Sequence, residues 1–288
     1  IDTFTDDTNL GTQTDCDRDS GSISSTVITE AAFVSDSDTA VLWHMDDLTD
    51  SSSNSNTIGR QNGADVSTTQ KKFGTKSFYV DGVNDSYGWC AISSDWAVGT
   101  GALTLECWVY TDHTGGAYAG VFGRWWGGNN IFDFRPKSAD ISNNFGVHDG
   151  TSMRNSGVGV PTNAWTHLAW TRDGSGDNNL WLNGVQKLNW TNSNNISSGW
   201  TGSMTIGATD SPTGYIFKGY IDEARFSTVE RYTSAFTPNG IITTNATGTL
   251  IQSANAVGSA KTKVGGTMLY KDNAGTATLG TDLKIYFT

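Results

Sequence analysis

The sequence predicts an all-β protein: an antiparallel two-sheet sandwich, preceded by an extended N-terminal arm and followed by a small C-terminal β appendage. Runs of about five to nine strand-forming residues alternate with clusters of Gly, Asn, Asp and Ser, which is the spacing of short strands joined by turns. Apolar side chains recur at every second position of residues 103–109, as in a strand with one buried face. The chain holds 34 Gly and 11 Trp but only 4 Pro, a composition that favours strands and polar turns over helices.

Residues 1–38 are predicted to form the extended arm. They are rich in Asp, Thr and Ser, and their apolar residues, such as Phe4 and Phe33, are scattered. Such a segment cannot bury a core of its own, so we expect a neighbouring chain to order it.

Residues 39–238 are predicted to form the sandwich. Two hairpin turns are marked within it, because DGSGDNN separates two apolar runs and NG follows NLWL. Gly, Asn and Asp at these places supply the positive φ angles that hairpin turns need. The strand-forming runs, in order, are AVLWHM, KSFYVDG, LTLECWVYTD, GVFGRWW, NIFDFRP, NFGVHDG, WTHLAWTRD, NLWLNGVQ, SMTIGAT and GYIDEARFS.

Residues 239–288 are predicted to add the small β appendage. Aromatic residues become rarer after Pro238, and about three strand-like runs follow, with DNAG as a turn. The chain begins with Ile1 and ends at Thr288 inside a strand-like run, which suggests a fragment of a longer product.

The charge of the chain argues against two classes of partner. With 18 Lys and Arg against 29 Asp and Glu, the net charge is −11. Nucleic acids and anionic membranes repel such a surface, so we expect neither as a partner. No apolar run approaches the roughly 18 residues that a membrane span needs, so membrane insertion is not expected.

The cysteines do not form a recognisable framework. Cys16, Cys90 and Cys107 have spacings that match neither a set of disulfides nor a zinc site. A Cys90–Cys107 bridge between neighbouring strands is conceivable, but buried free thiols are favoured. Cysteine usage therefore says little about the redox compartment.

Several segments of the sandwich region carry a resemblance to a known family. They are, in order, LWHMDDLTDSSSNSNT, FGTKSFYVDGVNDSY, LTLECWV, WTHLAWTRDGSGDNNLWLNGV and TIGATDSPTGYIFKGYIDEARFS. In kind and in order they are similar to the motifs of laminin-G-like, concanavalin A-like jelly-roll domains. The resemblance implies that the sandwich is a two-sheet jelly roll.

The same resemblance implies a structural Ca²⁺ ion. In these domains the first and last strands commonly lie close together, and a cation there ties the two ends. The matching positions are Asp46, after the first predicted strand, and Asp222, in the last one. Carboxylate oxygens suit Ca²⁺. The alternative is that Asp46 caps a turn and Asp222 makes local hydrogen bonds.

Catalytic carboxylates are not expected. Jelly-roll glucanases of the wider superfamily carry an E-x-D-x-x-E pattern that supplies a nucleophile and an acid. Glu106 has no acidic residue two positions on, and Asp222 and Glu223 should point to opposite faces of a strand. No GxSxG motif occurs, and the His residues are scattered. The sequence therefore predicts that the protein is not an enzyme.

The stretch RWWGGNN, residues 124–130, is the main candidate for ligand binding. Sugar recognition by a β sandwich needs an exposed aromatic ring and nearby polar groups. We interpret Trp125, Trp126, Asn129 and Asn130 as ligand-binding residues at a hairpin end, with Trp126 facing outward. Alternatively, one tryptophan seals the end of the sandwich and the other packs on a loop or a subunit.

A second candidate rim lies in the stretch NWTNSNNISSGW. Here Trp190 and Trp200 are surrounded by Asn and Ser, which could contact sugar hydroxyl groups. Tyr118 and Arg154 are additional candidates.

The two ends of the chain suggest the kind of assembly to which the protein belongs. The acidic arm and the tail TKVGGTMLYKDNAGTATLGTDLKIYFT resemble the structural and fibre proteins of tailed bacteriophages. This resemblance implies a homo-oligomeric virion protein whose ends contact other virion subunits and whose sandwich binds host-surface glycans. Two alternatives are a secreted or cell-surface bacterial carbohydrate-binding module or adhesin, and a jelly-roll glycoside hydrolase.

Overall fold

The structure is a computed structural model of the chain. It describes residues 10–14, 17–19, 22–24, 27–83, 85–91, 93–111, 118–126, 129–196, 203–209, 215–238, 240–243, 249–252, 259 and 278. Some strand side chains, including those of residues 124–126 and 129–132, lie outside this description. Contacts divide the chain into two compact units, residues 31–239 and the two chain ends together, 1–30 with 240–288. The division at residues 38 and 238 inferred from the sequence stays a prediction.

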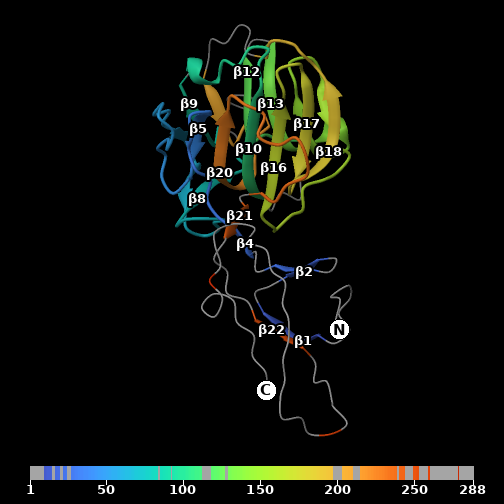
Figure 1. Cartoon of the computed structure of the whole chain (residues 1–288). Coiled ribbons are helices and arrows are strands. Elements are labelled where there is room, and N and C mark those ends of the chain that lie inside the picture. Colours follow the sequence, from blue (N-terminus) through green and yellow to red (C-terminus); the bar gives the residue numbers. More distant parts are fainter. Residues whose placement is uncertain are drawn as a thin grey trace. The chain divides into compact units, whose positions relative to one another are not determined.

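The larger unit contains two antiparallel sheets (Figure 1). One of them, the β10 sheet, has the strand order β18-β17-β16-β10-β20-β8-β7, and β5 also pairs with β20. Its strands are β5 (Thr39–Trp43), β7 (Asp65–Ser67), β8 (Ser77–Asp81), β10 (Leu103–Thr111), β16 (Thr166–Arg172), β17 (Asp177–Leu182), β18 (Val185–Thr191) and β20 (Lys218–Ser227).

The other sheet, the β13 sheet, has the order β15-β14-β13-β12-β19-β9-β6, and β11 also pairs with β13. Its strands are β6 (Gly59–Gln61), β9 (Tyr87–Cys90), β11 (Tyr118–Ala119), β12 (Phe122–Trp126), β13 (Asn129–Ser138), β14 (Asn144–His148), β15 (Met153–Asn155) and β19 (Met204–Ile206). Two short 3₁₀ helices, η1 (Ser94–Trp96) and η2 (Ala139–Ile141), complete the unit. The described residues include no helix long and apolar enough to span a membrane.

Apolar side chains from both sheets form the core between them. The alternating residues of β10 behave as the sequence predicts, because Leu103, Leu105, Cys107 and Val109 all belong to this core. From the other sheet, Phe122 and Phe134 stack with ring centroids 6.5 Å apart. Cys90 and Cys107 are buried free thiols, as favoured from the sequence. The predicted all-β two-sheet sandwich is confirmed.

The hairpin between β17 and β18 shows how the sequence sets a turn. Leu182 pairs with Val185, which leaves Asn183 and Gly184 as the turn residues. Their φ angles are 49° and 73°, respectively. This pair of positive values is what a two-residue hairpin turn needs, and Asn-Gly adopts it most readily.

Two segments cover the outer face of the β10 sheet, residues 31–38 and 228–238. Phe33 from the first and Phe236 from the second lie against His167, with ring centroids 6.1 and 5.8 Å away. An ion pair between Asp36 and Arg231, 2.7 Å long, joins the two segments. Trp108 is buried in this outer layer, where its ring lies 5.4 Å from that of His167. The sandwich therefore has a second packed layer outside its central core.

The smaller unit pairs the two ends of the chain. β1 (Leu10–Thr14) pairs with β22 (Thr249–Gln252), and β4 (Val27–Glu30) pairs with β21 (Gly240–Thr243). A short hairpin of β2 (Asp17–Asp19) and β3 (Ser22–Ser24) lies within the arm. The predicted arm thus finds strand partners in the predicted appendage of its own chain.

Candidate functional site

Within the RWWGGNN stretch, residues 124–126 end β12 and residues 129–130 begin β13. Backbone pairing places Trp125 opposite Asn130 and Trp126 opposite Asn129, with a register shift between Arg124 and Trp125. The side chains of these candidate residues lie outside the described part of the structure, as does the whole of Trp200. Their role in ligand binding stays a prediction.

Trp190 lies on the edge strand β18, where it joins the two sheets. Its indole N–H donates to Oδ2 of Asp149, 2.8 Å away, in the turn between β14 and β15. Nε of Arg154 donates to the same oxygen at 2.7 Å, and the Arg154 guanidinium lies 5.7 Å from the centroid of the Trp190 ring. Burial alone would raise the pKa of Asp149, but hydrogen bonds led by that of Thr151 hold the pKa well below its usual range. The polar edge of Trp190 is therefore committed to a contact within the protein.

Asp46 and Asp222, the candidate calcium ligands, meet the same loop. Oδ1 of Asp46 accepts the backbone N–H groups of Thr75 and Lys76, at 2.5 and 2.8 Å. Oδ2 of Asp222 accepts those of Lys72 and Phe73, at 2.7 and 3.2 Å. Loop 72–76 can approach because Gly74, at φ 57°, has no side chain to collide with the Asp46 carboxylate.

The N–H groups of loop 72–76 thus donate to Oδ1 of Asp46 and to Oδ2 of Asp222. Within the described residues, no group of three or more His, Cys, Asp and Glu side chains is placed to hold a metal ion. Burial raises the pKa of Asp222 to about 7. Protein donors contact both carboxylates, and calcium binding by Asp46 and Asp222 stays a prediction.

Asp222 and Glu223 do not alternate across the sheet as expected from a regular strand. Glu223 has a φ of 47°, and the register between β10 and β20 shifts beside it. This bulge turns both side chains to the outer face, where Glu223 Oε2 accepts the N–H of Phe33 at 2.7 Å. Oε1 of Glu223 lies 2.7 Å from Nδ1 of His44. The expectation of opposite faces was wrong because it assumed an unbroken strand.

An exposed tryptophan on the β13 sheet was missed by the sequence analysis. Trp89 is 41% exposed, and among the described residues it is the one aromatic side chain in the set of well-exposed large hydrophobic residues. Its neighbours in β9 face inward, since Cys90 belongs to the core and Gly88 lies against Phe78. Alternation therefore turns Trp89 to the outer face. The alternation of inward and outward side chains is present in YGWC, but four residues are too few for it to be recognised in the sequence.

The backbone of β6 keeps the exposed Trp89 ring in place. Trp89 pairs with Gly59 on one side and Thr205 on the other, and any side chain at Gly59 would collide with the indole. The indole therefore lies against the backbone of β6. Thr205 pairs in turn with Gly123, and the side chain of Thr209 lies against Gly123.

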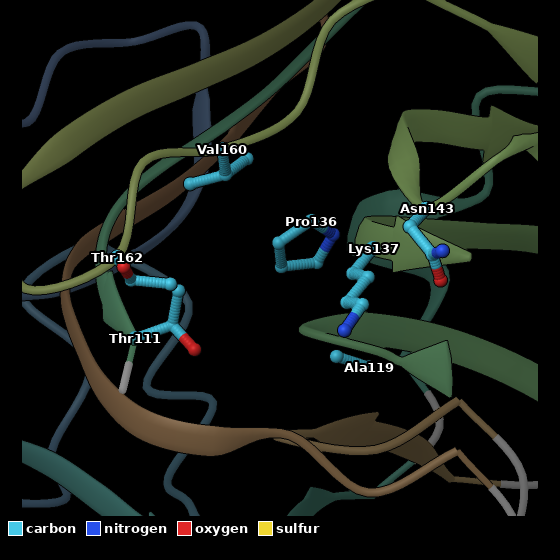
Figure 2. A pocket seen from close by; sticks show the side chains of 7 residues that line it. All are labelled: Thr111, Ala119, Pro136, Lys137, Asn143, Val160 and Thr162. Carbon is cyan, nitrogen blue, oxygen red and sulfur yellow. The ribbon is translucent and has the colours of Figure 1, made fainter. Parts of the chain in front are cut away.

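A small cavity lies at one end of the sandwich (Figure 2). Its volume is about 140 Å³. Figure 2 shows that its lining residues come from the end of β10, from β11, from β13 and from the loops around residues 143 and 160. They are Thr111, Ala119, Pro136, Lys137, Asn143, Val160 and Thr162. The lining of the cavity therefore contains both apolar and polar groups, and Lys137 is its cationic residue.

One protein-family model matches this chain. It is described as the concanavalin A-like lectin/glucanases superfamily (Laminin_G_3), and it covers residues 84–235. The match includes most strands of both sheets, with Trp89 and the residues lining the cavity. No curated protein matches the sequence.

Two solved structures are similar to this chain, and the first of them shows the same fold. Domain 4 of AbnA, a GH43 extracellular arabinanase from Geobacillus stearothermophilus solved with arabinotriose, aligns with a TM-score of 0.51 and 22% identity, over 67% of this chain and 93% of that one. The binding domain of Paraclostridial Mosquitocidal Protein 1 aligns with a TM-score of 0.49 and 11% identity, over 71% of this chain and 49% of that one. The chain spans about half of the mosquitocidal-protein binding domain (49%) and nearly all of the arabinanase domain (93%).

Proposed function

The chain belongs to the concanavalin A-like lectin/glucanase superfamily, and we propose that its sandwich binds glycans without cleaving them. The exposure of Trp89 on the outer face of the β13 sheet carries this proposal. A flat indole offers the surface on which the apolar face of a sugar ring stacks. Because the indole already lies against Gly59, little freedom would be lost on binding.

The state of the buried carboxylates supports binding over hydrolysis. A glycosidase needs two carboxyl groups that can reach the two sides of one glycosidic bond. Glu106 accepts hydrogen bonds from Arg225 and Tyr232 at 2.7 and 2.8 Å. Asp222 and Glu223 are engaged by backbone N–H groups and by His44. These three carboxylates hold the fold together, which leaves them poorly placed to act on a substrate.

Replacing Trp89 by alanine is expected to lower glycan affinity at least tenfold, about 1.4 kcal/mol, because the stacking surface is lost. The measurement is a glycan array followed by titration of the glycans that bind wild type. Val185→Ala, a change at another exposed apolar residue, is the control and should bind like wild type.

Two results would contradict the proposal. Equal binding by wild type and Trp89→Ala, with loss in Trp126→Ala, would move the site to the β12–β13 hairpin. Release of new reducing ends from a bound glycan would show that the protein is an enzyme after all.

We propose further that the domain is displayed on a virion surface and that the unit formed by the chain ends attaches it to other virion subunits. The pairing of β1 with β22 and of β4 with β21 supports this, since it gathers both ends into one unit apart from the sandwich. A homo-oligomer fits the same role, because repeated copies increase avidity for a glycan-coated surface.

Imaging of the assembled particle is the test of this role. We expect residues 1–30 and 240–288 to contact neighbouring subunits while the sandwich projects outward. A chain that is instead secreted as a monomer, with both ends free of neighbours, would favour a bacterial carbohydrate-binding module or adhesin.

A further inference from the structure

We propose that the cavity in Figure 2 binds a single carboxylated sugar, such as a terminal uronate, with the Lys137 ammonium as the partner of the carboxylate. This proposal rests on the glycan-binding function proposed above and assigns a second place on the sandwich, made of residues other than Trp89. It is carried by the size of the hollow, by its mixed lining and by the charge of Lys137.

The size of the cavity matches one ring. Its volume is about 140 Å³. A cavity of about 150 Å³ in another protein accepts a six-membered ring such as benzene, whereas a single water molecule takes up only about 30 Å³ of liquid. The hollow can therefore accept one sugar unit at the end of a glycan, but not a longer stretch of chain.

Lys137 is available as the cationic partner. It lies on β13 opposite Ala119, and among the described residues no carboxylate forms an ion pair with it. The carboxylate of Asp140, three residues along the chain, is instead directed at Nη1 of Arg135, 3.5 Å away. In a protein with a net charge of −11, an anionic sugar needs a local positive group of this kind.

The rest of the lining suits the other groups of a sugar. Pro136 and Val160 supply an apolar wall for C–H groups, while the Asn143 amide and the Thr162 hydroxyl can exchange hydrogen bonds with sugar hydroxyls. The hydroxyl of Thr111 donates to the carbonyl of Lys218 at 2.9 Å, which holds this part of the lining in place. Ser142 and Asn143 have φ angles of 61° and 62°, and the N–H of Asn143 donates to Ser138 at 2.8 Å, so this side of the hollow is held in place.

The test is a calorimetric or NMR titration of the full chain with D-glucuronate and, in parallel, with D-glucose. We expect glucuronate to bind at least tenfold more tightly than glucose, and Lys137→Gln to remove that preference. Lys137→Arg, which keeps the charge, should retain most of it. Lys187→Gln, which changes the net charge equally but lies on β18 in the other sheet, should behave like wild type.

Three results would overturn the proposal. They are equal affinity for glucose and glucuronate, unchanged glucuronate binding in Lys137→Gln, and an equal loss in Lys187→Gln. Displacement of glucuronate by the same concentration of sodium acetate would show a site for any small carboxylate and would overturn the sugar assignment. The wild-type chain could also bind no glycan on the array and yet bind glucuronate in a way that depends on Lys137 but not on Trp89. That result would support the cavity as a binding site and would reject the proposed function at Trp89.

Discussion

Replacing Glu106 by glutamine is expected to lower the free energy of unfolding by about 3–5 kcal/mol, the usual cost of breaking a buried ion pair from one side. Glu106 is fully buried on the outer face of the β10 sheet. Its Oε1 accepts from Nε and Nη2 of Arg225 at 2.9 and 2.7 Å. The Arg225 side chain is only 8% exposed, so the glutamine variant leaves its charged guanidinium buried without the carboxylate of Glu106.

The second carboxylate oxygen of Glu106 adds further contacts to those made with Arg225. Oε2 of Glu106 accepts from the Tyr232 hydroxyl at 2.8 Å and lies 3.1 Å from Nε2 of His167. The ring of Phe33 lies 4.0 Å from the Arg225 guanidinium, which closes the site from the side of residues 31–38. Loss of the charge of Glu106 should therefore loosen both covering segments, residues 31–38 and 228–238.

Urea denaturation of wild type and variants measures this cost. Asp65→Asn, at an ion pair with Arg60 in which both side chains are about half exposed, is the control, and it should cost at most about 1 kcal/mol. The double variant Glu106→Gln with Arg225→Met should be more stable than Glu106→Gln alone, because the stranded charge is gone. Equal stabilities of the single and double variants would show that the guanidinium is not the source of the cost.

The pH dependence of stability gives a second readout of the same carboxylate. Burial opposes ionisation of Glu106, but Arg225 and the hydrogen bond from His167 together lower its pKa to about 2. A lowered pKa means that the folded state holds its proton less tightly than the unfolded state. The stabilisation by Glu106 is therefore complete above the ordinary pKa of about 4.3 and is lost as the pH falls towards 2. Glu106→Gln should lack this part of the acid transition.

The sequence was sufficient to predict the architecture because the signals for it are local and repeated. Alternation in residues 103–109 selects one face of β10, and Asn183-Gly184 sets the β17–β18 hairpin. The resemblance of several motifs in order added the two-sheet arrangement. What local signals could not show was the second packed layer, because it depends on Phe33 and Phe236 meeting over the same strand from distant places in the chain.

The candidate site was less predictable for a physical reason. The family resemblance implied that Asp46 and Asp222 lie close together at a cation site, but nothing in the sequence indicated that loop 72–76 would donate N–H groups to both. The bulge at Glu223 could not be foreseen, since only the pairing register reveals it. Trp89 and Lys137 lie in runs with no unusual composition. Trp89 became a candidate because its side chain is exposed, and Lys137 because it lines a cavity, and both properties are defined only by the packed structure.

Replacing Arg172 by methionine is expected to cost about 3 kcal/mol or more, because buried carbonyl groups would lose their donor. Arg172 is buried at the end of β16 and has no acidic partner in direct contact among the described residues. Its Nε donates to the carbonyl of Gly101 at 2.9 Å, and Nη1 donates to that of Asn194 at 3.0 Å. Nη2 donates to the carbonyl of Gly99 at 2.9 Å.

The Arg172 guanidinium therefore fastens two loops, residues 99–101 and 192–196, to the end of the core. The N–H of Ile196 donates to the carbonyl of Gly99 at 3.2 Å and should exchange with solvent faster in the variant. Arg172→Lys should lie between wild type and Arg172→Met, because one ammonium cannot reach carbonyls that a planar fork serves together. Arg60→Met, at a half-exposed arginine, is the control. If Arg172→Met and Arg60→Met lose equal stability, or if exchange at Ile196 is unchanged, the two loops are held by their own turns and not by the guanidinium.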